Sequence, residues 1–185
     1  MSDYSNRSFS ELQHSYLRES SDAMPVAGFI CWAVLAALAW YQGDSLPYWA
    51  ILVAPAAPLP LSVLIDKLRG QPNVFEGDSN HPMTRLFMQF IAVIGVMIFF
   101  VIFAAREAGS IAILTLGVGL LSGAIWVPHG WSVDDPGGLI QFLLRAVLCF
   151  TAFFLAADTL VVPAIAAAVA VSYIHAIVFM KKRGQ

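Results

Sequence analysis

Six long apolar runs, almost free of charge and separated by short polar joints, make up most of this 185-residue chain. They cover about residues 25–41, 46–65, 83–105, 110–127, 138–157 and 159–180. Each is close to the roughly 20 residues that a helix needs to cross a hydrocarbon core. Because lipid offers no hydrogen bonds, a crossing segment must satisfy its own backbone as a helix. The runs therefore predict an all-α polytopic membrane bundle of six transmembrane helices.

Composition leaves little of the chain for anything else. Charged residues make up 12% of the sequence, whereas soluble domains carry roughly 25%. We therefore expect a cytoplasmic tail over residues 1–23 and a single transmembrane domain over residues 24–185, with the lipid bilayer as partner. The net charge of −2 is uninformative about nucleic acid, but the sequence has no basic stripe interleaved with aromatics, so we expect no nucleic-acid partner.

The orientation of the bundle follows from the basic residues beside the runs. Eight of the ten fall on one side of an alternating six-span path: Arg7, Arg18, Lys67, Arg69, Arg85, Lys181, Lys182 and Arg183. Arg106 lies on the other side, and Arg145 lies inside the fifth run. Because cytoplasmic joints collect Lys and Arg, the asymmetry predicts that both termini are cytoplasmic.

The N-terminal tail contains a sequence pattern that is typical of the start of a helix. Ser8 and Glu11 have the spacing of a capping box, in which each side chain satisfies a first-turn backbone donor. Phe9, Leu12 and Tyr16 then recur on one face. The pattern predicts a short amphipathic helix at the cytoplasmic interface; a docking helix for a partner is the alternative.

Three prolines interrupt the second run at Pro55, Pro58 and Pro60. Each removes a backbone hydrogen bond and clashes with the preceding turn, so the second span should be kinked or broken. In transporters such breaks often build the solute site. The alternative is a kinked helix that packs among its neighbours without forming a solute site.

The fourth run carries a G-x-x-x-G motif at Gly119 and Gly123. Small residues at this spacing let two helix backbones approach closely. Packing inside the bundle is the first interpretation, and a homo- or hetero-oligomer through this span is the second.

Arg145 is the residue with the strongest chemical signal, because an intramembrane arginine must pair, snorkel or face a cavity. Gln141 precedes it by one helical turn. Gln89, Asp66 and His129 come from three other spans and map to the same cytoplasmic third of the bundle. We predict that these five residues form a ligand site. Snorkelling of Arg145 and a purely structural Arg145–Asp66 pair are the alternatives.

The expected guest of such a site is an anion. Guanidinium groups recognise carboxylate and phosphate, so an anionic solute or a lipid headgroup would suit Arg145. No cofactor and no metal site is predicted, because His14, His81, His129 and His175 lack metal-ligand spacing. A haem held by two histidines on different helices stays open.

The motif at the end of the fourth run, GAIWVPHGW over residues 123–131, with Asn80 and Pro82 upstream, resembles a bacterial family of small multi-pass membrane proteins. That family is known only as a conserved domain of unknown function. The matching positions of its second motif are Gly123, Ala124, Pro128, Gly130 and Trp131. Ile125 replaces the family's usual histidine, and His129 replaces an aromatic. The resemblance implies a helical bundle in a bacterial cytoplasmic (inner) membrane and no known activity.

Three function classes remain. The first is a small-solute or ion carrier or channel with its polar site in the cytoplasmic third. The second is an accessory or structural subunit, which predicts a flat apolar face on the fourth or sixth span. The third is a membrane-embedded enzyme acting on a lipid or quinone through His129, Asp134 and Asp135. No catalytic residue is predicted, since no constellation has the required spacing.

Overall fold

The computed structural model describes residue 4 and residues 6–182. Arg183 and residues 1–3 and 5 of the predicted tail therefore lie outside the described residues. Every regular element in the described part is helical, which confirms the all-α prediction. The elements in chain order are α1 (Phe9–Glu19), α2 (Met24–Gln42), η1 (Gly43–Ser45), α3 (Tyr48–Ala56), α4 (Pro58–Leu68), α5 (Pro82–Glu107), α6 (Ile111–Ala124), α7 (Trp126–Ser132), α8 (Gly137–Leu155), η2 (Asp158–Leu160) and α9 (Val161–Phe179).

The predicted multi-pass architecture is confirmed. Five helical segments are long and apolar enough to cross a membrane: α2, α5, α6 with α7, α8, and η2 with α9. The pair α3 and α4 passes the same test together and is bent by 43°. Pro58 begins α4 and Pro55 lies inside α3, so the predicted kink falls where proline removes backbone donors.

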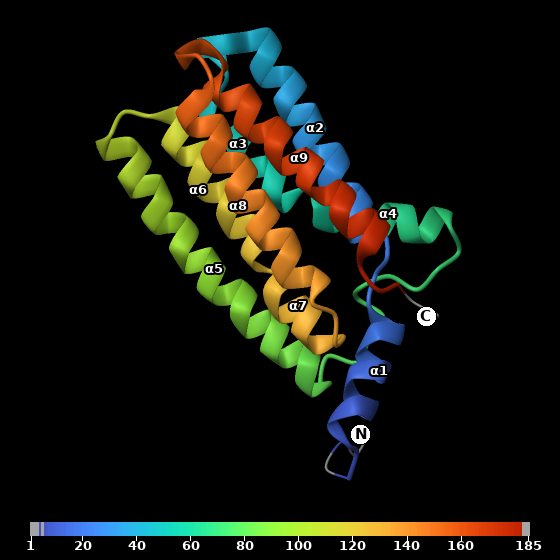
Figure 1. The fold of residues 1–185 in the computed structure, drawn as a ribbon. Coiled ribbons are helices and arrows are strands. Elements are labelled where there is room, and N and C mark those ends of the chain that lie inside the picture. Colours follow the sequence, from blue (N-terminus) through green and yellow to red (C-terminus); the bar gives the residue numbers. More distant parts are fainter. Residues whose placement is uncertain (1–3, 5, 183–185) are drawn as a thin grey trace.

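The passes bring both ends of the described chain to one end of the bundle, here called the terminal end (Figure 1). The segment between α1 and α2 lies there, beside the residues that follow α9. A hydrogen bond ties the C-terminal segment down, as the backbone N–H of Lys181 donates to Asp135 Oδ2 at 2.7 Å. The joints at η1 and η2 lie at the opposite end.

Helix α9 is the centre of the bundle and packs on α2, α8 and α6. Half of its most apolar window is buried, against 6% of the corresponding window of α5. Helix α5 stands at the side of the bundle and packs chiefly on α6 (Figure 1). The most exposed apolar helix is therefore α5, the third span, while the sixth span also exposes Val171, Ile174 and Val178 on one face.

The G-x-x-x-G motif packs inside this bundle. A Cβ atom at Gly119 would come within 3.0 Å of Val169 Cγ2 on α9. One at Gly123 would come within 2.7 Å of Arg145 Cδ on α8. Both glycines thus serve contacts between helices of the same chain, which is the first of the two interpretations.

Helix α1 lies at the terminal end of the bundle, where it contacts α5 and α7. Its predicted capping box is present, with Glu11 N–H donating to Ser8 Oγ and Ser8 N–H donating to Glu11 Oε2 at 2.7 Å. Phe9 packs edge-on against Trp131, with ring centroids 5.1 Å apart. The apolar face of α1 therefore packs on α7 and on the start of α5.

Candidate functional site

Arg145 lies on the inner face of α8 and is fully buried. Its Nε donates to Ser172 Oγ of α9 at 2.9 Å, and its Nη1 donates to Ser122 Oγ of α6 at 3.1 Å. Each serine hydroxyl gives its own proton to a carbonyl of its helix, Ser172 to Val169 and Ser122 to Gly119. Their lone pairs are therefore directed at the guanidinium, which joins three helices.

Two further features let the long, positively charged side chain of Arg145 fit between these helices. The absence of a side chain at Gly123 makes room for the Arg145 stem, since a Cβ there would overlap Cδ. The ring of Tyr173 covers the guanidinium, with Arg145 Cζ 4.4 Å from the ring centroid. An aromatic face attracts a cation most strongly where water is excluded.

The charge of Arg145 has no countercharge among the described residues. No ion pair in that part of the chain involves Arg145. The groups that bind Arg145 are hydroxyls, a carbonyl and a ring, all neutral, and its Nη2 has no hydrogen-bond partner there. Both alternatives for Arg145 are therefore wrong: it does not snorkel, and it does not pair with Asp66.

Gln141 joins this cluster from the preceding turn of α8. It is fully buried, and its Nε2 donates to the same Ser172 Oγ at 3.4 Å. Its Oε1 has no partner among the described residues. The cluster of Arg145, Gln141, Ser122 and Ser172 thus contains one donor and one acceptor that the described protein atoms leave unsatisfied.

The other three predicted site residues lie elsewhere. His129 contacts Trp126 and Phe87 through its ring, and Tyr16 Oη lies 3.5 Å from its Nδ1. Asp66 is buried and accepts a hydrogen bond from Ser21 Oγ at 2.6 Å. Gln89 is exposed on α5. The structure therefore brings together Arg145 and Gln141, and it does not gather all five residues at one point.

The acidic loop of the enzyme hypothesis has structural contacts. Asp135 Oδ1 accepts from Gly137 N–H at 2.7 Å, while its Oδ2 holds Lys181 N–H. Asp134 has a positive φ of 53° and pairs with Lys181. Among the described residues no group of three or more His, Cys, Asp or Glu side chains could hold a metal ion.

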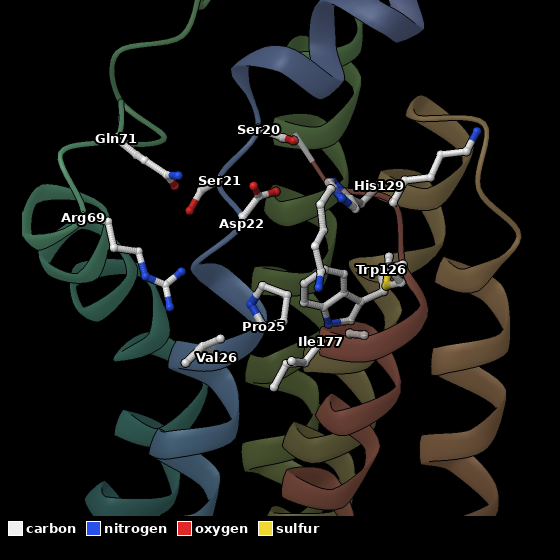
Figure 2. Close-up of a pocket in the computed structure, with 14 residues that line it drawn as sticks. Ser20, Ser21, Asp22, Pro25, Val26, Arg69, Gln71, Trp126, His129 and Ile177 are labelled. Atoms are coloured by element: carbon white, nitrogen blue, oxygen red, sulfur yellow. The ribbon is translucent and has the colours of Figure 1, made fainter. Parts of the chain in front are cut away.

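A pocket of about 290 Å³ opens at the terminal end (Figure 2). Its lining includes Trp126 of α7 together with Ala176 and Ile177 of α9. Tyr173 lies one helical turn beyond that pair, and its ring meets the Trp126 ring edge-on at 6.0 Å. The two rings therefore connect the pocket to Arg145, and Tyr173 contacts both Trp126 and the guanidinium.

A second pocket, of about 200 Å³, lies beside the kink, between α2 and α3. Its lining is almost wholly apolar and includes Ala54 and Ala57, while Pro55, Pro58 and Pro60 do not contribute to it. The prolines bend the span without placing polar groups around a cavity there.

Sequence reasoning missed Tyr173, Ser122 and Ser172. Serine and tyrosine are common in membrane helices, so only their helical spacing could have signalled a role. Ser122 follows Gly119 by three residues and precedes Gly123 by one, which puts all three near one helix face.

Comparison with known proteins identifies the family of this chain. A family model described as "Family of unknown function (DUF7010)" matches residues 10–183. No curated protein and no solved structure matches the chain. A match over nearly the whole chain agrees with the resemblance seen in the motif of residues 123–131, and this multi-pass membrane protein belongs to the DUF7010 family of unknown function.

Proposed function

We propose that this protein is a small membrane carrier for an anion, with Arg145 as the group that binds it inside the bundle. The observation that carries the proposal is a fully buried guanidinium whose described partners are all neutral and whose Nη2 is unsatisfied. Gln141 and Ser172 would orient the anion beside it.

The energetics of burial support this proposal. Removing an ion from water costs several kcal/mol even after the protein relaxes, unless a countercharge or strong hydrogen bonds compensate. Two hydroxyls, a carbonyl and the Tyr173 ring offset part of that cost for Arg145. A bound carboxylate or phosphate would supply the missing charge, and the guanidinium fork fits both.

The route to Arg145 would lead through the pocket at the terminal end. Eight of the ten basic residues lie on that side of the predicted path, so we expect it to face the cytoplasm. A shift of the Tyr173 ring away from Trp126 would open the pocket toward the guanidinium. Rearrangement of packed side chains between two states is a common basis for gating.

The proposal is tested in proteoliposomes loaded with chloride, phosphate or acetate, with anion efflux measured under an imposed membrane potential. We expect the wild-type protein to release at least one of these anions faster than protein-free liposomes. Arg145→Gln should abolish this release, whereas Arg106→Gln, at an exposed position on α5, should leave it unchanged.

A further variant separates a folding defect from a binding defect. Gln141→Leu keeps the charge of Arg145 and removes only the neighbouring amide, so it should fold and weaken efflux. Wild-type protein that releases none of the three anions, and whose thermal unfolding none of them shifts, would contradict the proposal. A bound ligand at a hundred times its Kd stabilises a protein by about 2.7 kcal/mol, which such a measurement detects.

An accessory subunit is the second candidate, and the exposure of α5 favours it. This 26-residue helix has little buried surface and carries exposed Val96, Phe99 and Phe103. Lipid or a partner helix could cover it. Cysteines placed at these positions would form intermolecular cross-links in membranes if α5 packs on a second copy of the chain.

A further inference from the structure

We propose that two copies of this chain pair in the membrane through the outer face of α5, with the Gln89 amides of the two copies hydrogen-bonded to each other. This inference does not rest on the carrier function, and it names the occupant of a face that the accessory role leaves open. The face consists of exposed residues that follow one another at alternating intervals of three and four, here called the α5 stripe: Gln89, Ala92, Val96, Phe99 and Phe103.

The α5 stripe faces away from the rest of the bundle. Helix α5 packs inward through Val101, which lies on nearly the opposite side of a helix with 3.6 residues per turn. The backbone of α6 approaches that inner side closely, since a Cβ at Gly117 would come within 2.5 Å of Val101 Cγ1. Within the stripe, Val96, Phe99 and Phe103 are 65–69% exposed, and α5 stands at the side of the bundle (Figure 1). The described part of the chain therefore leaves the stripe uncovered.

Gln89 indicates that more than lipid covers the stripe. Helix α5 has 26 residues, so at 1.5 Å per residue it is about 39 Å long and exceeds a hydrocarbon core of about 30 Å. Gln89 lies about 10 Å from its start, which places the amide inside the hydrocarbon. Arg85, one turn earlier, is long enough to keep its charge among the headgroups. Lipid chains cannot hydrogen-bond to an amide, whereas glutamines in membrane helices bond across helix interfaces.

A second copy of the chain satisfies the polar groups of α5 with the same surface. A carboxamide carries both a donor and an acceptor, so two Gln89 side chains related by a two-fold axis can each donate to the other. At the opposite end of α5, Arg106 and Glu107 are exposed neighbours, and Arg106 of one copy would meet Glu107 of the other. All copies insert in one orientation, so the paired helices run parallel and equivalent residues face each other. Alternating intervals of three and four residues are typical of such a left-handed helix pair.

The experiment measures energy transfer between donor-labelled and acceptor-labelled copies of the full chain in phosphatidylcholine liposomes, at increasing dilution in lipid. Wild-type copies should transfer energy beyond the level of random encounters. Gln89→Leu removes the amide and leaves an exposed apolar side chain that lipid solvates, so each chain should still fold. Its dissociation constant should be about tenfold higher, the size expected for a lost polar contact between membrane helices. Gln42→Leu, at an exposed position at the end of α2, should leave the constant unchanged.

Disulfide cross-linking in membranes reads the register of the pair. The background variant is Cys31→Ala, since Cys149 is fully buried and out of reach of a second chain. Val96→Cys, within the stripe, should link two chains, whereas Met97→Cys, which is exposed but points about 100° away, should not.

Three results would overturn the proposal. Wild-type copies without energy transfer at any dilution would show that lipid or a different protein covers the stripe. Equal dissociation constants for the wild type and Gln89→Leu would remove the role of the amide. Equal cross-linking at Val96 and Met97 would show random encounters instead of a defined interface.

Discussion

The ring of Tyr173 lies over the guanidinium of Arg145, with 4.4 Å between the ring centroid and Cζ. Both residues are buried, one on α9 and the other on α8. The ring therefore covers one side of a cation that has no carboxylate beside it among the described residues. It also separates that cation from Trp126 and the pocket.

Replacing Tyr173 with leucine should lower the free energy of unfolding by about 2 kcal/mol or more, the usual size of a desolvated cation–π contact. Tyr173→Phe keeps the ring and should stay within about 0.5 kcal/mol of the wild type. Reversible unfolding in mixed detergent micelles measures both. Equal losses for the two variants would show that the hydroxyl, and not the ring, is what Arg145 needs.

Adding a methyl group at Gly123 should destabilise the bundle. The new Cβ would lie 2.7 Å from Arg145 Cδ, and three hydrogen bonds prevent that side chain from moving aside. Overpacking of this kind costs about 1–3 kcal/mol.

Gly95 provides the matched control for that variant, because it lies within α5 with no neighbouring atom within 4 Å of a new Cβ. Gly95→Ala should instead stabilise the protein by roughly 0.5–1 kcal/mol through the helix propensity of alanine. Parallel unfolding curves give both values, and the prediction fails if Gly123→Ala is as stable as Gly95→Ala.

Acidification should weaken the docking of α1. His81 is buried at the start of α5, where Nδ1 accepts from Met83 N–H at 3.2 Å and Nε2 lies 2.8 Å from Ser15 Oγ. Burial lowers the pKa of His81 below its usual value, although Glu19 and Asp78 partly oppose that effect. The folded protein therefore holds the neutral ring, while the unfolded chain takes up a proton more readily.

Since the unfolded state binds more protons, this contribution to stability is present above about pH 6.5 and decreases as the pH falls toward 5. Hydrogen exchange of the α1 amides, compared at the two ends of that range, should show faster opening in acid. His81→Asn keeps a side-chain acceptor for Met83 N–H and cannot take up a proton in this range. It should therefore reduce the pH dependence, and an unchanged dependence would assign the effect to another group.

Asp135 should be important for the position of the C-terminal segment. Its carboxylate accepts from the N–H groups of both Gly137 and Lys181, at 2.7 Å each. Asp135→Ala should cost about 1–3 kcal/mol, because two donors lose a charged acceptor. Proteolysis near residue 181 should become faster, whereas Asp158→Ala, at the opposite end of the bundle, should leave the rate unchanged.

The helices and the kink follow from local properties of the chain. Long apolar runs need only their own backbone to become helices in lipid, and closely spaced prolines bend any helix. The capping box of α1 is equally local, since Ser8 and Glu11 are three residues apart. These features do not depend on which helices become neighbours, so they could be predicted from the sequence.

The composition of the site depended on helix rotation and pairing. Gln89 and Gln141 look equivalent in depth, yet Gln89 is exposed on α5 and Gln141 is buried beside Ser172. The partners of Arg145 come from α6 and α9, selected by the space at Gly123 and by the stacking of Tyr173. The sequence alone determined that an arginine lies within a membrane-crossing helix. Only the packing of three helices decided that its surroundings are neutral, because side-chain contacts between spans depend on rotations that no single span encodes.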